Sequence, residues 1–554
     1  VELGRYPGTC YQAANWQAIG LTAGRGRQDA AHEAALPRKV LLVYPLQKDF
    51  RPVLCREPER PRLAPRPAPA PAPAPPPPPR TWQEEEFGGV ALGDERLVRR
   101  LHTIAGDFFA RPTMNIPQAC GSRAKAKAVY RFLDHPRVHL ESVLSGHYQA
   151  TRRRAAAYPV VLAVQDTTEL NYSTHRACEM LGPVGDRQSQ AVGLWVHNTM
   201  AYNLEGTPLG LIDLQCWARD PEDRGKRERR YALPIEQKES AKWLVSYRAA
   251  TRLQAECPGT VVVSVGDREA DVYELFVEAR AREGQAQVLV RATRERKLEA
   301  EEAEEEESRQ LWAHVRGQAV GGEVELKVPR RGSGAARTAV LEIRYASVEL
   351  KAPKRKLGLG SVRLWAVAAE EVGEPAGVEP IQWYLLTTLA VESLEQAVEK
   401  LRWYALRFQI EVYHRTLKSG CKIEERQLGN AERIEACLGI DLVVAWRIAH
   451  LAKLGREVPE VPCTVYFEEA QWQAMLVWAT KQLPPAQPPT LREMVRLVAT
   501  HLGGFLGRKR DGEPGAQSLW RGLQRLDDIT QMWCAVGGVK WVSPTEVELG
   551  EDSS

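Results

Sequence analysis

Five strand-like segments between residues 158 and 291 limit the fold of this chain more than any other feature. In chain order they are Tyr158–Gln165, Leu194–Asn203, Leu209–Trp217, Thr260–Val265 and Gln287–Arg291. The first and the fourth (YPVVLAVQ and TVVVSV) are short, nearly continuous apolar runs, as expected of strands buried inside a sheet. Asp166 follows the first run, and Gly266–Asp267 follows the fourth. The pattern predicts a sheet with a carboxylate at the end of each of two buried strands.

Helical segments separate the later strands. Lys238–Ala255 has the spacing of an amphipathic helix, and Asp271–Arg282 is a second predicted helix. Three strands followed by alternating helix and strand predict an α/β fold, a ribonuclease-H-like core in which helices pack on a mixed five-stranded sheet.

The rest of the 554-residue chain divides by composition. Residues 1–80 end in a proline–alanine tract and are expected to be a disordered extension. Helices at Leu97–Phe109 and Arg123–Leu133 predict a helical module over 81–150. The core is assigned to 151–298 and 392–455. A β-rich insertion, 299–391, interrupts it. The insertion begins with an acidic run (Glu299–Glu307), which we interpret as a solvated loop. Residues 456–554 read as a final helical module, and Ile434–Leu454 as a long helix before it.

Composition excludes several classes of protein. No stretch approaches the ~20 apolar residues of a transmembrane helix, and the beginning of the chain lacks the order of a signal peptide, so a cytoplasmic protein with no membrane partner is expected. The ten cysteines form no C-x-x-C pair, which argues against a zinc knuckle or a dithiol redox site. No phosphate-binding G-x-x-x-x-G-K-[ST] loop is present.

The segment Trp403–Ser419 (WYALRFQIEVYHRTLKS) carries the densest group of candidate site residues. On one continuous helix, the side chains of Tyr404, Arg407, Glu411, Arg415 and Lys418 would share one stripe. The other side of that helix is expected to be apolar, with Leu401, Ala405, Phe408, Ile410 and Leu417. A carboxylate among cations and a tyrosine suits a metal ion held against a phosphate backbone.

Asp166, Asp267 and Glu411 together predict a metal site. Three converging carboxylates raise one another's pKa unless a cation compensates them, and oxygen donors favour Mg²⁺ or Mn²⁺. Two such ions ~3.5–4 Å apart could promote in-line attack on a phosphodiester. Each residue also has a structural interpretation: Asp166 could lie in a turn, Asp267 could cap a helix, and Glu411 could belong to a surface ladder with Arg407 and Arg415. We interpret two further carboxylates, Asp271 and Glu169, as solvated groups or as groups that support the metal ligands. We interpret His197 and His414 as hydrogen-bonding core or supporting residues.

Longer motifs add a resemblance to this interpretation. They include EFGGVALGDERLVRRL (Glu86–Leu101), VYRFLDHPRV (Val129–Val138), QDTTEL (Gln165–Leu170), WVHN (Trp195–Asn198), KESAKWL (Lys238–Leu244), GDREAD (Gly266–Asp271), QWYLLTTLAVES (Gln382–Ser393) and LGGFLGRKRDG (Leu502–Gly512). With the pattern Y-x₂-R-x₃-E-x₆-K at Tyr404, Arg407, Glu411 and Lys418, the chain resembles bacterial cut-and-paste DDE transposases of the IS-four type from Trp82 to about Trp533. The first eighty residues have no counterpart in that family.

The resemblance implies that Asp166, Asp267 and Glu411 are catalytic and bind Mg²⁺, for which Mn²⁺ may substitute. It implies that Tyr404, Arg407 and Lys418 grip phosphates, and that Trp383 stacks on a flipped base while a DNA hairpin forms, although Trp383 could also be an ordinary core aromatic. Arg291, with Arg294, Arg296 and Lys297, is expected to line the DNA path. Basic residues of the N-terminal module are expected to recognise the terminal inverted repeats; they are Arg96, Arg99, Arg100, Arg123, Lys125 and Lys127. The implied partners are double-stranded DNA, both transposon ends and target, and a second copy of the chain, in a bacterial cytoplasm near the nucleoid.

Three functions fit the sequence. The first is an active transposase that nicks DNA, forms and opens a hairpin, and joins 3′-hydroxyl ends to target DNA. The second is a catalytically inactive DNA-binding protein that pairs with an active transposase and inhibits it. The third is a host nuclease with the same metal chemistry. The complete set of carboxylates favours the first function over the second, and the C-terminal resemblance to a pairing module argues against the third.

Overall fold

The computed structural model describes residues 16–23, 37–44, 81–186, 188–221, 233–299, 309–328, 337–373, 379–508 and 511–536. The chain forms two units, Val1–Pro78 and Pro79–Ser554. In the first unit, β1 (Gln17–Leu21) pairs antiparallel with β2 (Val40–Val43). The expectation of a disordered extension over 1–80 is therefore wrong for these two segments, while the proline–alanine tract lies outside the described residues.

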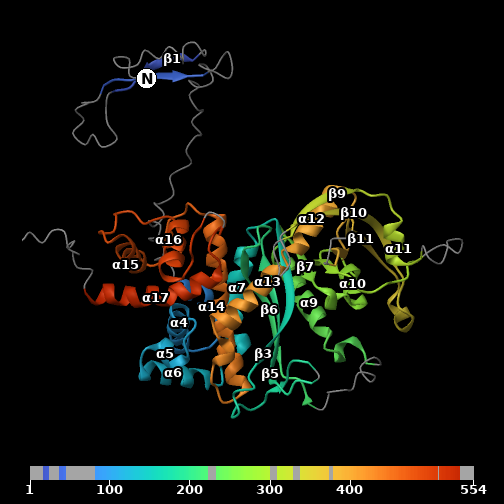
Figure 1. Cartoon of the computed structure of the whole chain (residues 1–554), viewed down its shortest axis with the longest axis horizontal. Coiled ribbons are helices and arrows are strands. Elements are labelled where there is room, and N and C mark those ends of the chain that lie inside the picture. Colours follow the sequence, from blue (N-terminus) through green and yellow to red (C-terminus); the bar gives the residue numbers. More distant parts are fainter. Residues whose placement is uncertain are drawn as a thin grey trace, which may run out of the picture. The chain divides into compact units, whose positions relative to one another are not determined.

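A ten-stranded mixed sheet organises the second unit (Figure 1). Its first part contains β3 (Val160–Asn171), β5 (Val192–Tyr202), β6 (Pro208–Trp217), β7 (Val261–Gly266) and β8 (Gln287–Arg291). The spatial order is β6-β5-β3-β7-β8, in which β3 pairs antiparallel with β5 and parallel with β7, and β7 pairs parallel with β8. All five predicted strands are confirmed.

The sheet continues past β8 through the insertion. Its strands there are β9 (Gly322–Val328), β10 (Arg337–Leu350), β11 (Val362–Glu371) and β12 (Gln382–Thr387), and β12 pairs antiparallel with β8. A short strand, β4 (Gly182–Pro183), pairs with β5 at the other end. The mixed sheet is therefore larger than the five strands expected, because the insertion covers the open edge of β8 instead of leaving it exposed.

Helices cover both faces of the sheet. Alternate residues of β3 and β7, such as Val161 and Val262, pack with α9 (Ala241–Glu256) and α10 (Tyr273–Arg280). The intervening residues, such as Leu162 and Val263, belong to the core formed with α12 (Leu394–Ala405), α13 (Phe408–Arg415) and α14 (Ala431–Glu457). A helix, α11 (Leu311–Arg316), packs beside the insertion strands. The fold is mixed α/β.

Helical modules flank the sheet in sequence. The N-terminal one contains α3 (Trp82–Phe87), α4 (Glu95–Ala110), α5 (Ile116–Cys120), α6 (Arg123–Leu133) and α7 (Leu140–Ala155). The C-terminal one contains α15 (Glu469–Thr480), α16 (Leu491–Leu497), a π-helical turn (Val498–Leu502) and α17 (Ala516–Ala535). None of the helices in the described ranges is long and apolar enough to cross a membrane.

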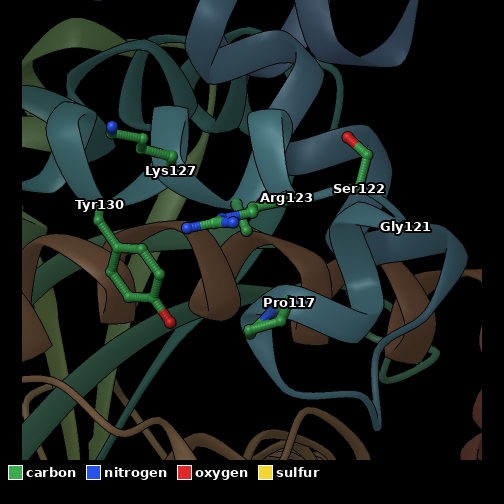
Figure 2. Close-up of a pocket in the computed structure, with 7 residues that line it drawn as sticks. Pro117, Gly121, Ser122, Arg123, Lys127 and Tyr130 are labelled. Carbon is green, nitrogen blue, oxygen red and sulfur yellow. The ribbon is translucent and has the colours of Figure 1, made fainter.

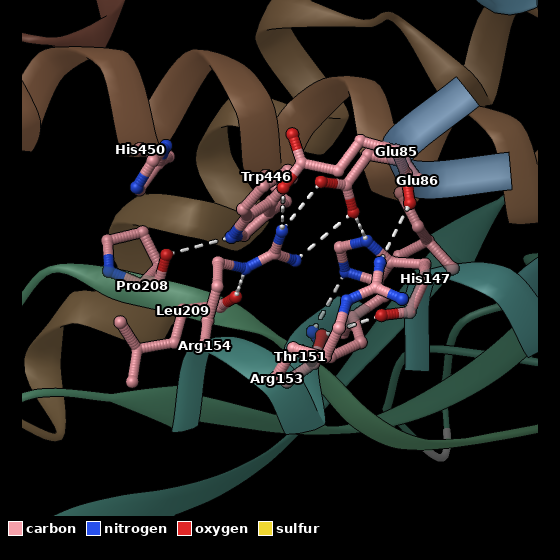
Figure 3. A network of polar contacts seen from close by, with 12 residues as sticks. Glu85, Glu86, His147, Thr151, Arg153, Arg154, Pro208, Leu209, Trp446 and His450 are labelled. Atoms are coloured by element: carbon pink, nitrogen blue, oxygen red, sulfur yellow. Dashed lines mark hydrogen bonds and ion pairs between the residues drawn. The ribbon is translucent and has the colours of Figure 1, made fainter. Parts of the chain in front are cut away.

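A buried ion network ties α3 to the sheet (Figure 3). Glu86 Oε2 accepts a hydrogen bond from His147 Nδ1 at 2.5 Å, and Glu86 Oε1 lies 2.7 Å from Arg154 Nη1. His147 Nε2 accepts from the Leu211 backbone N–H at 3.0 Å, so the imidazole is the neutral Nδ1–H tautomer. Burial raises the pKa of Glu86, but His147 and Arg154 outweigh it and lower that pKa to about 2. The N-terminal module is thus anchored by a carboxylate that stays ionised.

Candidate metal and nucleic-acid site

The pleat of the sheet places Asp166 and Asp267 on the same face. Along β3, Leu162 and Val164 face the core that contains α13, and Asp166 follows with the same alternation. Along β7, Val263 and Val265 do the same, and Asp267 is the next residue in step. Val164 is level with Val265 in the parallel ladder, so Asp166 and Asp267 are also level with each other. Two carboxylates from neighbouring strands therefore meet under α13.

Both aspartates differ in detail from the sequence prediction. Asp166 does not end its strand, because β3 continues to Asn171 along β5, and Asp166 pairs with Asn198. Its interpretation as a turn residue is therefore wrong. Asp267 Oδ1 accepts a hydrogen bond from the Glu269 backbone N–H at 2.8 Å and caps the short 3₁₀ helix that follows. The capping interpretation of Asp267 is confirmed, and it leaves Oδ2 available.

The predicted continuous helix over 403–419 is wrong. α12 ends at Ala405, and a tight turn through Leu406 and Arg407 separates it from α13. α13 then passes into a π-helical turn at Thr416–Gly420, which carries Lys418. The apolar side is only partly as expected, because Phe408 is 57% exposed while Ile410 and Leu417 are buried. The π turn adds a residue per turn, so Lys418 leaves the stripe that Glu411 defines.

Arg407 lies between the carboxylates. Its Nη2 is 2.7 Å from Glu411 Oε1, and its Nη1 is 3.8 Å from Asp166 Oδ1. Burial lowers the pKa of Arg407, but Asp166, Tyr404, Glu411 and Asp267 raise it further than burial lowers it. The Arg407–Glu411 pair is the i,i+4 contact foreseen as the structural interpretation of Glu411. The Arg407 guanidinium also lies near Asp166, so it links Glu411 to Asp166.

The negative charges of Asp267 and Glu411 both act on Asp166. Burial raises the pKa of Asp166 to about 6; Arg407 opposes this increase, while Asp267 and Glu411 add to it. Burial likewise raises the pKa of Asp267. Desolvated carboxylates with raised pKa values gain most from an added cation.

The carboxylates suit a hard divalent ion by their chemistry, although their side chains are not gathered around one. Among the residues that the structure describes, no three His, Cys, Asp or Glu side chains lie close enough together to enclose a metal. Arg407 supplies the positive charge between Asp166 and Glu411. The oxygen donors and the excess negative charge fit Mg²⁺ or Mn²⁺, provided that Arg407 moves aside.

Cations and aromatic rings adjoin the carboxylates on the side of the insertion. Tyr404 is buried and lies beside Arg291 at the end of β8, and its ring meets Trp383 of β12 edge-on at 5.7 Å. Burial raises the pKa of Tyr404 and lowers that of Arg291. Trp383 packs against the core, as its interpretation as a core aromatic predicts. It is only partly buried, so part of its ring remains accessible.

Lys418 and Arg415 point to different places. Lys418 Nζ donates to the Glu169 carbonyl at 2.8 Å and lies 3.4 Å from Glu424 Oε1, beside the continuation of β3. Arg415 Nη2 donates to Gln517 Oε1 of α17 at 2.5 Å. Lys418 therefore lies beside the last residues of β3, after Asp166, whereas Arg415 joins α13 to the C-terminal module.

Two buried polar residues, His414 and Asn198, lie next to Asp166. His414 Nε2 lies 3.0 Å from Asn198 Oδ1, and His414 Nδ1 lies 3.7 Å from Asp166 Oδ2. Burial lowers the pKa of His414 to about 3, so the ring is neutral. His197 is also buried and its Nδ1 lies 2.8 Å from Thr167 Oγ1. The interpretation of both histidines as hydrogen-bonding core residues is confirmed.

Lys242 is a neighbour of the site that sequence reasoning did not single out. It is 9% exposed, donates to Glu269 Oε2 at 3.2 Å, and lowers the pKa of Asp267 against the larger raising effect of burial. Its position inside the motif KESAKWL was the available signal.

The basic stretch after β8 is only partly available to a ligand. Arg296 is buried and forms an ion pair with Asp271, which also accepts the backbone N–H groups of Thr293 (2.9 Å) and Arg294 (3.0 Å). The prediction that Arg296 lines the DNA path is therefore wrong. Asp271 is buried and holds this loop in place, so it is not a solvated side chain.

The basic residues of the N-terminal module occupy two exposed helices. Arg99 and Arg100 are exposed on α4, where Arg99 lies 3.9 Å from Glu95. On α6, Arg123, Lys127 and Tyr130 line one side of a pocket of about 540 Å³ whose other wall contains Pro117 and Gly121 (Figure 2). Lys125 instead pairs with Asp107 at 2.8 Å. The N-terminal module therefore has exposed cations on α4 and α6, in a part of the chain that precedes all three carboxylates.

Two known family models match the flanking modules. The transposase DNA-binding model matches residues 79–138, and the transposase Tn5 dimerisation-domain model matches residues 443–533. Both matches support a transposase. They also support DNA as a partner and a dimerisation module at the C-terminal side, beginning within α14.

One solved structure that matches part of the chain weakly is a cryo-EM structure of a piggyBac transposase synaptic complex with hairpin DNA. It is 8% identical, the match covers 66% of this chain and 67% of that chain, and the TM-score is 0.33. A similarity of that size carries no argument about the fold of this chain.

Proposed function

We propose that the protein is a cut-and-paste DNA transposase of the IS-four DDE type with a ribonuclease-H-like core. The observation that carries the proposal is the placement of Asp166 on β3 and of Asp267 directly after the parallel neighbour β7, with Arg407 linking Asp166 to Glu411. The strand order β6-β5-β3-β7-β8 supports the assignment of the core. The two transposase modules that flank this sheet in sequence supply the substrate class.

In this proposal, Asp166, Asp267 and Glu411 hold Mg²⁺ or Mn²⁺ ions, which would activate a water or a 3′-hydroxyl and stabilise the leaving oxygen. The residues of the chain have separate tasks. Arg407, released from Glu411 and Asp166, binds a phosphate beside the cut, and Tyr404 and Lys418 hold neighbouring phosphates. His414 and Asn198 bond to each other beside Asp166 and place no further charge next to it. Arg291 would extend the cationic surface along the DNA path.

Trp383 is proposed to stack on an extruded base while a DNA hairpin forms. Its ring is already ordered against Tyr404. Stacking on an aromatic ring contributes ~1–3 kcal/mol per base, which is comparable to the cost of extruding the base. Arg99 and Arg100, with the α6 cations, would bind the terminal inverted repeats, and the C-terminal module would pair two protomers in a synaptic dimer.

The deciding experiment is cleavage of a DNA that carries the flanking ends of the gene, with Mg²⁺ or Mn²⁺ present. Wild type should release hairpin-ended fragments, and Glu411→Gln should bind the same DNA without cutting it. Glu425→Gln is the matched control, because this exposed carboxylate pairs only with Lys422 in the described part of the chain. Equal cleavage by wild type and Glu411→Gln would contradict the assignment of the carboxylates. Binding without cleavage by wild type would favour the inactive inhibitor.

A further inference from the structure

A second pocket, with a mostly apolar lining, lies beside α13, where the sheet, α14 and the beginning of α17 meet. Its volume is about 260 Å³, and its polar lining side chains are those of Tyr202, Gln409, Lys453 and Arg456. Gly515, the N-cap of α17, and Ala516, its first residue, are also part of the wall. We call it the α17 pocket. It shares no lining residue with the carboxylate site.

The hydroxyl of Tyr202 has no partner in this pocket. Tyr202 is 1% exposed, and among the described residues its Oη is buried without a hydrogen bond. A buried hydroxyl left unpaired costs free energy, so such groups are normally satisfied by protein, water or ligand. The Tyr202 hydroxyl is a donor that lacks an acceptor.

The beginning of α17 adds further donors. α17 is 20 residues long, its N-cap is Gly515, and no side chain in the described part of the chain caps it. The first N–H groups of a helix lack acceptors within the helix, and the helix dipole makes this end partly positive. Uncapped helix starts are therefore suited to anions, phosphates in particular.

The side-chain charges around the pocket are positive. Lys453 has no ion pair within the described ranges, although Glu457 acts on it at longer range. The nearby acids are committed elsewhere: Glu457 accepts hydrogen bonds from Asn203 (2.6 Å) and Thr207, and Glu513 binds Arg492 and Arg496 at 2.6 and 3.0 Å. Arg456 donates to the carbonyls of Glu513 and Pro514, which holds it at the rim.

We propose that the α17 pocket binds a phosphate-class oxyanion, held by Lys453, the Tyr202 hydroxyl and the amide groups that begin α17. The anion comes either from a DNA backbone or from free phosphate. The pocket shares no lining residue with the three carboxylates, although the charge of Asp166 reaches the Tyr202 hydroxyl. A bound anion would join α13 to the dimerisation module.

The test is thermal unfolding of the full chain, without divalent metal, as inorganic phosphate is added. Phosphate should raise the melting temperature of wild type by a few degrees, because a ligand that binds only the folded state stabilises it. Lys453→Gln should weaken this response about tenfold or more in phosphate concentration, as expected for a lost charged hydrogen bond. Tyr202→Phe should weaken it as well, yet should be at least as stable as wild type without phosphate, because it removes an unpaired hydroxyl.

Matched controls separate this effect from general damage. Tyr413→Phe removes a buried hydroxyl that donates to the Leu442 carbonyl at 3.1 Å, so it should lose stability and keep the phosphate response. Lys351→Gln removes an exposed lysine elsewhere. A phosphate response that is absent in wild type, or equal in wild type, Lys453→Gln and Tyr202→Phe, would overturn the proposal, provided that DNA affinity is also unchanged.

Affinity for a short DNA duplex identifies the source. If Lys453→Gln and Tyr202→Phe lose DNA affinity in parallel with phosphate affinity, the natural ligand is a backbone phosphate. If only the phosphate response is lost, the ligand is free phosphate. Neither measurement reads cleavage, so an inactive protein could still confirm the pocket, and an active one could still refute it.

Discussion

Arg407 Nη2 lies 2.7 Å from Glu411 Oε1, so a guanidinium already neutralises the carboxylate that we propose as a metal ligand. The same guanidinium lies 3.8 Å from Asp166. A metal ion and Arg407 would compete for these oxygens. Metal binding would therefore free Arg407 for a DNA phosphate.

Arg407→Gln should strengthen Mn²⁺ binding to the DNA-free protein about three- to tenfold, because a competing positive charge is removed. The measurement is calorimetric titration with Mn²⁺ at pH 8, where Asp166 is ionised. The same variant should bind cleavable DNA more weakly. Arg415→Gln is the control, since Arg415 bonds to Gln517 and not to the carboxylates. Equal Mn²⁺ affinity in wild type and Arg407→Gln would contradict the competition.

Metal binding should depend on pH through Asp166. Its pKa rises from 3.8 to about 6 on folding, so the folded protein holds this proton more tightly than the unfolded chain does. The metal-free protein should therefore lose stability as the pH rises from about 4 to about 6, and Mn²⁺ affinity should increase between about pH 5 and pH 7. Asp166→Asn should abolish this part of both dependences, as seen in melting curves with and without Mn²⁺. Mn²⁺ affinity that stays constant over this range would refute the assignment.

DNA binding by the N-terminal module should depend on salt through the exposed cations of α4 and α6. Each phosphate contact contributes about 0.9 to the slope of log affinity against log salt, so the pair Arg123→Gln and Lys127→Gln should reduce the slope by about 2. Arg99→Gln with Arg100→Gln should act in the same direction. Lys125→Gln should change the slope little, because Asp107 already binds its amine. Fluorescence anisotropy of a terminal-repeat duplex at several salt concentrations measures all three.

Glu86→Gln should destabilise the protein by ~3–5 kcal/mol in urea unfolding at pH 7, because Arg154 would be left without its buried partner. Glu85→Gln is the control, since the Glu85 side chain is 53% exposed and 3.7 Å from Arg154. The Glu86 pKa of about 2 lies below its ordinary 4.5, so its contribution is present above about pH 4.5 and is lost as the pH falls towards 2. Glu86→Gln should lack this acid dependence. A loss of stability equal to that of Glu85→Gln would show that the network is not an anchor.

Local periodicity was a sound guide where one face of an element is buried. The five core strands, α6 and α14 lie within a few residues of their predicted places, because apolar alternation and helical spacing report burial directly. Periodicity failed at 403–419, where a turn after α12 and a π turn after α13 interrupt the spacing. α13 and the π turn contact β3 and α14, and a helical wheel contains no such contacts.

The sequence by itself determined the succession of strands along the chain, the carboxylates that come directly after two buried apolar runs, and the basic character of α4 and α6, because these depend on residue type and on nearest neighbours. Only the tertiary structure decided that the insertion extends the core sheet, that Arg296 is buried against Asp271, and that Arg407 stands between Asp166 and Glu411. These relationships join residues far apart in the chain, and their energies depend on burial and distance in three dimensions. The unpaired hydroxyl of Tyr202 beside the start of α17 is of the same kind, since no local pattern records what a side chain lacks.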